Sequence, residues 1–560
     1  MRVALALCCC LGWIALAAYS QQPSTVPDEV FYNGKIVTVD NSFRIQEAFA
    51  VQGEKFSSVG SNAEVLALAG PSTRRTDLRG RTVIPGLMDN HNHQFHAGIV
   101  FLRGTDLRGV RSLAELLDRI REEAARTPSG RAVYGSMGWN PNEFPERKAP
   151  TRQDLDEAAP NHPVVVYQAR GLARLNTAAL GLAGFSRERN TVGRATALKD
   201  SSGELTGVLS GSPSAVMNPT SDISPLTLDE IKENILEIER RQNAVGLTSI
   251  RDLQIRPDVM RAYYELWQEG KHTLRVSMGL ELNPEDVDQL DDRLRNWGVG
   301  TGFGDEWLRL DGIAEFNPGN GNYREPPLNP DEDDAREFRL PVESYREAIL
   351  LMNRMGWRPS PHINADGGLD QVLDAYEAAD LESSIRDKRW VVEHVPIMHP
   401  DQMDRIKRLG VMVSAQMQPY RGAASFVRQL GRERAERAVP MREMLDHGLI
   451  VSTGSDWPNP LLNPFANLYY YVTRNTLQAG PLGVAQKISR AEALRVSTVN
   501  HAYLTFEEKI KGSIEAGKLA DFLILSADIM TVPEDQIPDI RPLATYVGGE
   551  RVFSQEGSGF

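Results

Sequence analysis

The chain has 560 residues, of which 41% are hydrophobic and 24% are charged, and its formal net charge is −13. This composition is typical of a folded globular protein and argues against intrinsic disorder and against a multi-span membrane protein. An acidic surface repels phosphate backbones, so we expect no nucleic-acid partner.

The N-terminus has the pattern of a secretory signal peptide. Arg2 precedes an apolar run over residues 3–19, and the small residues Ala18 and Ser20 stand at the −3 and −1 positions of a cleavage site. This predicts a signal peptide over residues 1–20 and a secreted or periplasmic protein. The alternative is a membrane anchor, but the run is at the short limit for crossing a bilayer, so we expect no stable membrane insertion after cleavage. All three cysteines lie in this run, so the mature chain is expected to form no disulfide.

Both ends of the mature chain have the sequence pattern of short β-strands. Residues 21–80 include a predicted strand at 48–52, and residues 512–560 include predicted strands at 521–525 and 543–547. Because the two ends flank one larger domain, we expect them to pair into a small composite β-sandwich domain.

Residues 81–511 alternate short apolar runs with helix-patterned stretches, which predicts an α/β fold with a parallel sheet. Eight runs indicate a closed (β/α)₈ TIM-type barrel with its chemistry at the C-terminal ends of the strands. The predicted strands are residues 82–87, 246–252, 274–279, 307–316, 358–364, 390–394, 411–416 and 449–455. Helices are predicted at 371–379, 400–409 and 441–447.

A long insertion, at about residues 97–244, follows the first barrel strand. It exceeds a normal strand-to-helix connection and is expected to carry its own elements and to shape the pocket. Trp139 is a candidate substrate contact, with plain packing as the alternative. Arg170 could pair with a substrate carboxylate, although arginines near loops are usually solvated.

Four of the ten histidines stand at the ends of predicted strands. His91 and His93 lie at i and i+2, and the alternation of side chains along a strand sends both to one side. His362, His394 and Asp456 end three later strands. Nitrogen and oxygen ligands at four strand ends would meet above the barrel axis, and this donor set suits Zn²⁺ or a similar divalent cation. For any single histidine, the alternative is a hydrogen-bonded structural residue.

Several motifs together resemble the amidohydrolase superfamily. They are VIPGLMDNHNH at 83–93, His362 with ADG at 365–367, EH at 393–394, QP at 418–419 and GSDWP at 454–458. Within the superfamily they resemble the amidohydrolase 3 group, typified by N-substituted formamide deformylase. The segments YNGKIVTVD at 32–40 and GSIEAGKLAD at 512–521 extend the resemblance over nearly all of the mature chain.

The resemblance implies a metal-dependent barrel hydrolase with one or two divalent cations, Zn²⁺ being favoured. Carried over by motif, the ligands are His91, His93, His362, His394 and Asp456. A bound cation lowers the pKa of its water and polarises the scissile carbonyl. Asp456 is then the expected general base, which takes a proton from the water and passes it to the leaving nitrogen.

The sequence departs from the family on the fourth barrel strand, where the family places a lysine that bridges two metals once carbamylated. Aligning residues 310–316 puts Ala314 at this position, with Glu315 beside it. Either Glu315 supplies the bridging carboxylate through a one-residue shift of register, or the site holds one ion. The alternative for Glu315 is a carboxylate that faces the helices or solvent, but a strand buried on both faces makes an unpaired glutamate costly.

Two more departures lie where substrate would be held. Residues 170–176 lack the histidine that the family carries in the insertion. Gln418 and Pro419 are followed by Tyr420 and Arg421 in place of the usual polar residue and histidine. Tyr420 therefore joins Trp139 and Arg170 as a candidate substrate contact, and the identity of the substrate does not carry over from the family.

We expect an exported metal-dependent hydrolase of a non-peptide carbon–nitrogen bond, an amide, that acts on a small molecule by a metal-activated water. One alternative is hydrolysis of a carboxylic or phosphoric ester at the same centre. Another is a non-catalytic binding protein that kept the barrel and lost turnover. The oligomeric state is open, a homodimer included.

Overall fold

The computed structural model describes most of the chain. The described residues are 26–94, 104–169, 171–193, 195–211, 213–221, 223–282, 286–316, 323–328, 340–457 and 462–560. The predicted signal peptide and Arg170 lie outside these residues. Within them, no helix combines the length and the apolar character that crossing a bilayer requires.

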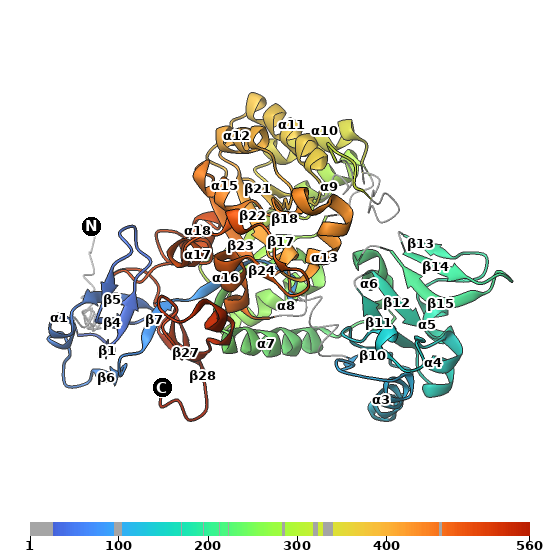
Figure 1. Ribbon diagram of the computed structural model, residues 1–560, viewed down its shortest axis with the longest axis horizontal. Coiled ribbons are helices and arrows are strands. Elements are labelled where there is room, and N and C mark those ends of the chain that lie inside the picture. The colour runs from blue at the N-terminus through green and yellow to red at the C-terminus, as the bar shows by residue number, and fades with distance from the viewer. Residues whose placement is uncertain are drawn as a thin grey trace, which may run out of the picture.

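The centre of the molecule is a TIM-barrel-type α/β fold of parallel strands (Figure 1). One ladder has the order β8-β16-β17-β18-β19 and the next has the order β20-β21-β22-β23, with Pro361 between β19 and β20. The strands return to β8 at its end, where Asn92 pairs in parallel with Trp457, and the His93 N–H donates to the Trp457 carbonyl at 2.8 Å. The strands are β8 (Leu87–Asn92), β16 (Leu247–Ile255), β17 (Arg275–Leu280), β18 (Leu308–Ala314), β19 (Pro359–Ser360), β20 (His362–Ile363), β21 (Val391–His394), β22 (Met412–Gln416) and β23 (Val451–Gly454).

Helices alternate with these strands, and α11, α12 and α15 occupy the three segments predicted as helices. In α12, Pro400 stands in the first turn, and Gly410 ends the helix with a left-handed φ of 66°. The buried residues Met403, Ile406 and Leu409 form its apolar stripe. The helices are α7 (Leu228–Ala244), α8 (Pro257–Gln268), α9 (Val287–Asn296), α10 (Val342–Arg354), α11 (Asp366–Glu382), α12 (Pro400–Leu409), α13 (Gln418–Leu430), α14 (Arg432–Ala435), α15 (Met441–Asp446), α16 (Pro464–Thr473), α17 (Arg490–Val496) and α18 (Val499–Leu504), with a hairpin of β24 (Asn475–Thr476) and β25 (Gly480–Pro481) after α16.

Strands from both ends of the chain lie together beside the barrel (Figure 1, left). One sheet has the order β28-β27-β26-β7-β2-β3 and another has the order β5-β4-β1-β6. Rings from both sheets share a core, in which Phe49 stacks on Phe31 at 4.7 Å and meets Phe522 edge-on at 4.8 Å between ring centroids. The elements are β1 (Glu29–Tyr32), β2 (Lys35–Val37), β3 (Ile45–Gln46), β4 (Ala48–Gln52), β5 (Lys55–Gly60), α1 (Asn62–Leu66), β6 (Arg74–Asp77), β7 (Thr82–Pro85), β26 (Phe522–Leu525), β27 (Pro542–Val547) and β28 (Glu550–Ser554).

The prediction was wrong about where the first barrel strand begins. Residues 82–87 do not form one strand, because β7 pairs with β2 and β26, and the barrel strand β8 starts at Leu87. Gly86 lies at the transition, where a side chain would overlap with Thr248 of β16. Apolar character continues from β7 into β8, so hydrophobic periodicity does not reveal the boundary.

A seven-stranded sheet between β8 and α7 projects away from the barrel (Figure 1, right). Its order is β13-β14-β15-β12-β11-β10-β9. Along β11, Val164 and Val166 pack into one core and Val165 and Tyr167 into another, so the sheet is covered on both faces. The elements are β9 (Gly104–Thr105), α3 (Leu113–Arg126), β10 (Val133–Gly135), α4 (Arg152–Ala158), β11 (Val164–Ala169), β12 (Leu172–Leu175), α5 (Thr177–Leu182), β13 (Thr191–Val192), β14 (Ala195–Lys199), β15 (Leu205–Ser210) and α6 (Pro213–Ser221).

Candidate functional site

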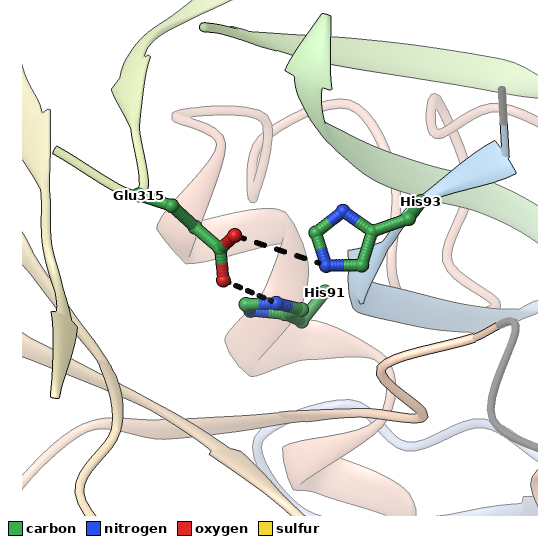
Figure 2. Close-up of side chains that lie close together, drawn as sticks. All are labelled: His91, His93 and Glu315. Atoms are coloured by element: carbon green, nitrogen blue, oxygen red, sulfur yellow. Dashed lines mark ion pairs between the residues drawn. The ribbon is translucent and has the colours of Figure 1, made fainter. Parts of the chain in front are cut away.

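The end of β8 carries two histidines whose rings lie next to each other. His91 is fully buried, His93 is 5% exposed, and their ring centroids are 5.0 Å apart. The carboxylate of Glu315 points at both rings (Figure 2), with 3.2 Å between Glu315 Oε1 and His91 Nε2 and 4.0 Å between Glu315 Oε2 and His93 Nε2. The structure therefore brings the predicted HxH pair and Glu315 together.

Glu315 reaches the histidines because the chain turns at the end of β18. The strand ends at Ala314, and Glu315 adopts a φ of 52°, in the left-handed region that is uncommon for residues other than glycine. Ala314 packs closely against β17, where a methyl group on Gly279 would lie 2.4 Å from the Ala314 Cβ. Ala314 is therefore tightly packed at the position of the expected bridging lysine. Glu315, the next residue, supplies a carboxylate instead.

His362 and His394 approach the same carboxylate from two other strands. His362 Nδ1 lies 2.9 Å from Glu315 Oε1, and His394 Nε2 lies 3.4 Å from the same oxygen. The two imidazole rings are 4.2 Å apart between centroids. Glu315 therefore has imidazoles on both sides.

Asp456 follows β23 and approaches from the side of the HxH pair. Its Oδ1 lies 3.4 Å from His93 Nε2 and 3.8 Å from His91 Nε2. Asp456, like Glu315 and His394, has a left-handed backbone, with φ values of 55°, 52° and 69° respectively. Such conformations are uncommon for residues other than glycine, and three of those in the described chain lie at strand ends in this group.

The side chains form two groups of potential metal ligands that share Glu315. One group contains His91 and His93 and the other contains His362 and His394, and within each group the ligand atoms lie within 4.8 Å of one another. Ligand atoms held at about 2 Å from one tetrahedral ion would lie roughly 3.3 Å apart. His91 Nε2 is buried and forms no hydrogen bond, as expected of an atom that faces a cation. The residues present therefore fit a divalent cation.

The electrostatics of the group favour a positive charge among the carboxylates. Burial by itself would lower the pKa of His91, but the charges of Glu393 and Glu315 raise it to about 10. Burial, and then the charges of His362 and His91, lower the pKa of His394 to about 4, so this ring is neutral at pH 7. Burial alone would raise the pKa of Glu315, yet the surrounding histidines hold it well below its ordinary value.

Each of these histidines also has a partner on its other ring nitrogen. The pairs are His91 with Glu393 (2.8 Å), His93 with the Leu253 carbonyl (3.3 Å), His362 with Asn364 (3.0 Å) and His394 with Gln418 (2.8 Å). At His91 and His93 the partner is an oxygen acceptor, so the outer nitrogen carries a proton and Nε2 faces the other ligands. At His362 and His394 the partner atom is an amide nitrogen. Glu393 was not among the predicted site residues, although a charged residue in a strand buried on both faces was a usable signal. Asn364 and Gln418 carried no comparable signal.

The predicted substrate contacts fall in different parts of the molecule. Trp139 is 5% exposed in a core of the insertion, where its ring stacks on Phe144 at 5.9 Å and its indole N–H donates to the Tyr167 carbonyl at 3.0 Å. Tyr420 is buried in the first turn of α13, the helix that begins with the amide partner of His394. Packing accounts for the described contacts of Trp139, and a substrate contact by either residue stays a prediction. Arg170 lies outside the described residues.

Comparisons with known proteins place this arrangement in a family. The sequence profile described as the amidohydrolase family matches residues 75–553. The chain is 28% identical to N-substituted formamide deformylase of Arthrobacter pascens, over 95% of this chain and 99% of that protein. It is 27% identical to protein LONG AFTER FAR-RED 3 of Arabidopsis thaliana, over 97% of this chain and 94% of that protein. An uncharacterized metal-dependent hydrolase from Pyrococcus furiosus superposes with a TM-score of 0.72 at 25% identity, over 90% of this chain and 100% of that one.

Proposed function

The chain belongs to the amidohydrolase family and is a metal-dependent hydrolase of carbon–nitrogen bonds, and we propose that its substrate is a small non-peptide amide. The formamide deformylase that matches nearly the full length of the chain supports an amide over an ester. The sequence departs from the family at residues 170–176 and 420–421, near the expected substrate position. The identity of the acyl and amine groups of the amide therefore does not carry over from the family.

The observation that carries this proposal is the position of Glu315 between two pairs of histidines. A carboxylate has two oxygens and can bridge two cations, as a carbamylated lysine does elsewhere in the family. Oε1 of Glu315 faces His91, His362 and His394, and Oε2 faces His93. We therefore propose that Glu315 replaces the lysine as the bridge.

The proposed centre holds two divalent cations, with Zn²⁺ favoured by the nitrogen and oxygen donors. The assigned ligands are His91, His93 and Asp456 for one cation, His362 and His394 for the other, and Glu315 for both. When bound, a divalent cation lowers the pKa of a water molecule toward neutrality and polarises the amide carbonyl.

Asp456 is the proposed general base. Its left-handed backbone at the end of β23 holds the carboxylate next to His93, at 3.4 Å. It takes a proton from the attacking water and delivers it to the leaving nitrogen, so that the amide yields a carboxylic acid and an amine. Glu315 is less suited to this work, because histidines on both sides hold its pKa well below its ordinary value.

We also propose export, with residues 1–20 as a cleaved signal peptide and the mature protein secreted or periplasmic. The basic and apolar pattern of the segment and the position of all three cysteines within it support this. We continue to expect no nucleic-acid partner and no membrane anchor after cleavage. These are predictions from the sequence, as is a possible homodimer.

The experiment that tests the proposed function is a comparison of initial rates on panels of amides, carboxylic esters and phosphotriesters. We expect turnover of at least one amide, its loss after chelation and its recovery with Zn²⁺. Turnover confined to esters would overturn the amide assignment. Tight metal binding without turnover of any class would favour a binding protein.

A further inference from the structure

Beneath the histidines, the barrel interior contains a layer of buried charges. Barrel interiors are ordinarily filled with branched apolar side chains. Here Arg251 of β16, Asp311 of β18, Arg358 before β19 and Glu393 of β21 are each at most 3% exposed, and they form a chain of ion pairs. Burying charges is costly even when they are paired, so this layer calls for a role other than stability.

Glu393 connects the charged layer to the proposed metal centre. Its Oε2 accepts a hydrogen bond from His91 Nδ1 at 2.8 Å, and its Oε1 accepts from Arg251 Nη1 and from the Ser360 hydroxyl. Arg251 donates in addition to Ser360 Oγ at 2.7 Å and to Asp311 Oδ2 at 2.6 Å. Arg251 also donates to the Asn90 carbonyl at 3.3 Å, so four described acceptors hold the guanidinium, and the Glu393 carboxylate is held with it.

The contact with Glu393 determines how His91 faces the centre. An ionised carboxylate only accepts hydrogen bonds, so Nδ1 of His91 carries a proton, and Nε2, which lies 3.2 Å from Glu315, is the nitrogen that would face a bound cation. The other histidines of the two groups meet an amide or a backbone carbonyl on their outer nitrogens. His91 therefore has a negatively charged partner there, which makes its Nε2 the more strongly donating ligand.

We propose that Glu393, fixed by Arg251 and Ser360, is a positioning residue that orients His91 and strengthens it as a ligand of the metal centre. The inference rests on the proposed function, because it requires a cation at His91. Arg358 and Asp311 balance the charges of Arg251 and Glu393, and neither contacts His91 among the described interactions, although Asp311 also pairs with Arg251.

The test measures the affinity of the metal-free full-length protein for Zn²⁺ by competition with a chromophoric chelator. Glu393→Gln keeps the shape of the side chain and removes its charge, and we expect Zn²⁺ to bind about 10 to 100-fold more weakly. Arg358→Met is the matched control, since it breaks an ion pair of equal burial in the same layer but leaves Glu393 with Arg251. We expect both variants to have a lower thermal midpoint, and the affinity of Arg358→Met to stay within about 2-fold of wild type.

A second variant keeps the inference testable if Glu393→Gln fails to fold. Ser360→Ala removes a hydrogen bond to Glu393 without leaving a charge unpaired, and a weakening of Zn²⁺ binding by about 3-fold is expected. Wild-type affinity of Glu393→Gln for Zn²⁺ would overturn the positioning role. If Glu393→Gln does not fold, wild-type affinity of Ser360→Ala would do so. Equal weakening of Zn²⁺ binding in Glu393→Gln and Arg358→Met would also overturn it. Failure of the wild-type protein to bind Zn²⁺ would instead overturn the metal centre itself.

Discussion

Oε1 of Glu315 lies 3.2 Å from Nε2 of His91, which forms no hydrogen bond of its own. The carboxylate follows β18 and the imidazole lies on β8, so the barrel and the left-handed turn at Glu315 together bring them into contact. A carboxylate oxygen and an imidazole nitrogen at this distance can share one cation.

Removing the charge of Glu315 is expected to release the bound metal from the proposed metal centre. Glu315→Gln cannot bridge two cations, so we expect most of the bound metal to be lost and Zn²⁺ affinity to fall by at least about 100-fold. Metal content per chain after dialysis measures this. The control is Asp521→Asn, a buried carboxyl that pairs with Arg275 at 2.8 Å and makes no described contact with the proposed ligands. Full metal content in Glu315→Gln would remove it from the ligand set.

Metal loading is expected to need no bicarbonate. A bridging lysine must first react with carbon dioxide, whereas the Glu315 carboxylate is part of the chain. Reconstitution of the metal-free protein with Zn²⁺ should therefore proceed to the same extent in buffers free of carbon dioxide and in buffers with bicarbonate. A requirement for bicarbonate would point to a carbamylated lysine elsewhere in the site.

Asp456→Asn is expected to separate metal binding from turnover. Asparagine retains an oxygen that can face a cation but cannot accept the proton of water, so kcat should fall by roughly 10²–10⁴-fold. Metal content, measured in the same preparation, should remain close to that of wild type. Unchanged kcat would show that another group takes the proton.

The buried pair of His272 and Glu239 predicts a pH dependence of stability. The two side chains lie 2.7 Å apart between α7 and α8. Burial alone would lower the pKa of His272, but the charge of Glu239 and its hydrogen bond raise it above 6.5. The stabilisation is therefore complete below pH 6.5 and is lost as the pH rises through the higher pKa of the folded state.

Thermal midpoints between pH 5.5 and pH 9 test this dependence. The difference between wild type and His272→Gln should be largest at the acidic end and should shrink as the pH rises. Glu239→Gln removes the charge that raises the pKa, so burial then lowers the pKa of His272 and the dependence should reverse, with Glu239→Gln losing stability relative to His272→Gln toward the acidic end. A constant difference between wild type and His272→Gln would contradict a charged pair.

Trp139→Ala is expected to destabilise the insertion and not to act through substrate. Truncating a buried tryptophan costs roughly 3–5 kcal/mol, and here it also frees the Tyr167 carbonyl. Proteolysis within residues 104–221 should accelerate, whereas KM should change little under conditions in which the insertion stays folded. A raised KM without loss of stability would show that Trp139 contacts substrate.

The sequence predicts the barrel well because its strands and helices follow strong local rules. The apolar runs at β16 through β23 and the capped helix α12 agree with their predicted segments. The start of β8 was misplaced, because apolar residues run without interruption from β7 across Gly86 into β8. Only long-range pairing, of β7 with β26 and of β8 with β16, distinguishes the two strands.

The candidate site was harder to predict at Glu315 than at the histidines. His91 and His93 follow from strand alternation, but the same alternation places Ala314 and Glu315 on opposite faces. The left-handed turn at Glu315 reorients its side chain, and no residue-type preference predicts a φ of 52° for a glutamate. The charge of Glu393 in a buried strand was a signal for a role, but the role itself depends on Arg251 and Ser360, which lie on other strands.

The most direct test of the metal centre is anomalous diffraction at the zinc edge from crystals of the protein loaded with Zn²⁺. The account predicts two peaks, one on each side of the Glu315 carboxylate, each at about 2.0–2.2 Å from its imidazole nitrogens. A single peak among the same residues would leave the ligands in place and reject the bridge. No peak within this group of side chains would contradict the account.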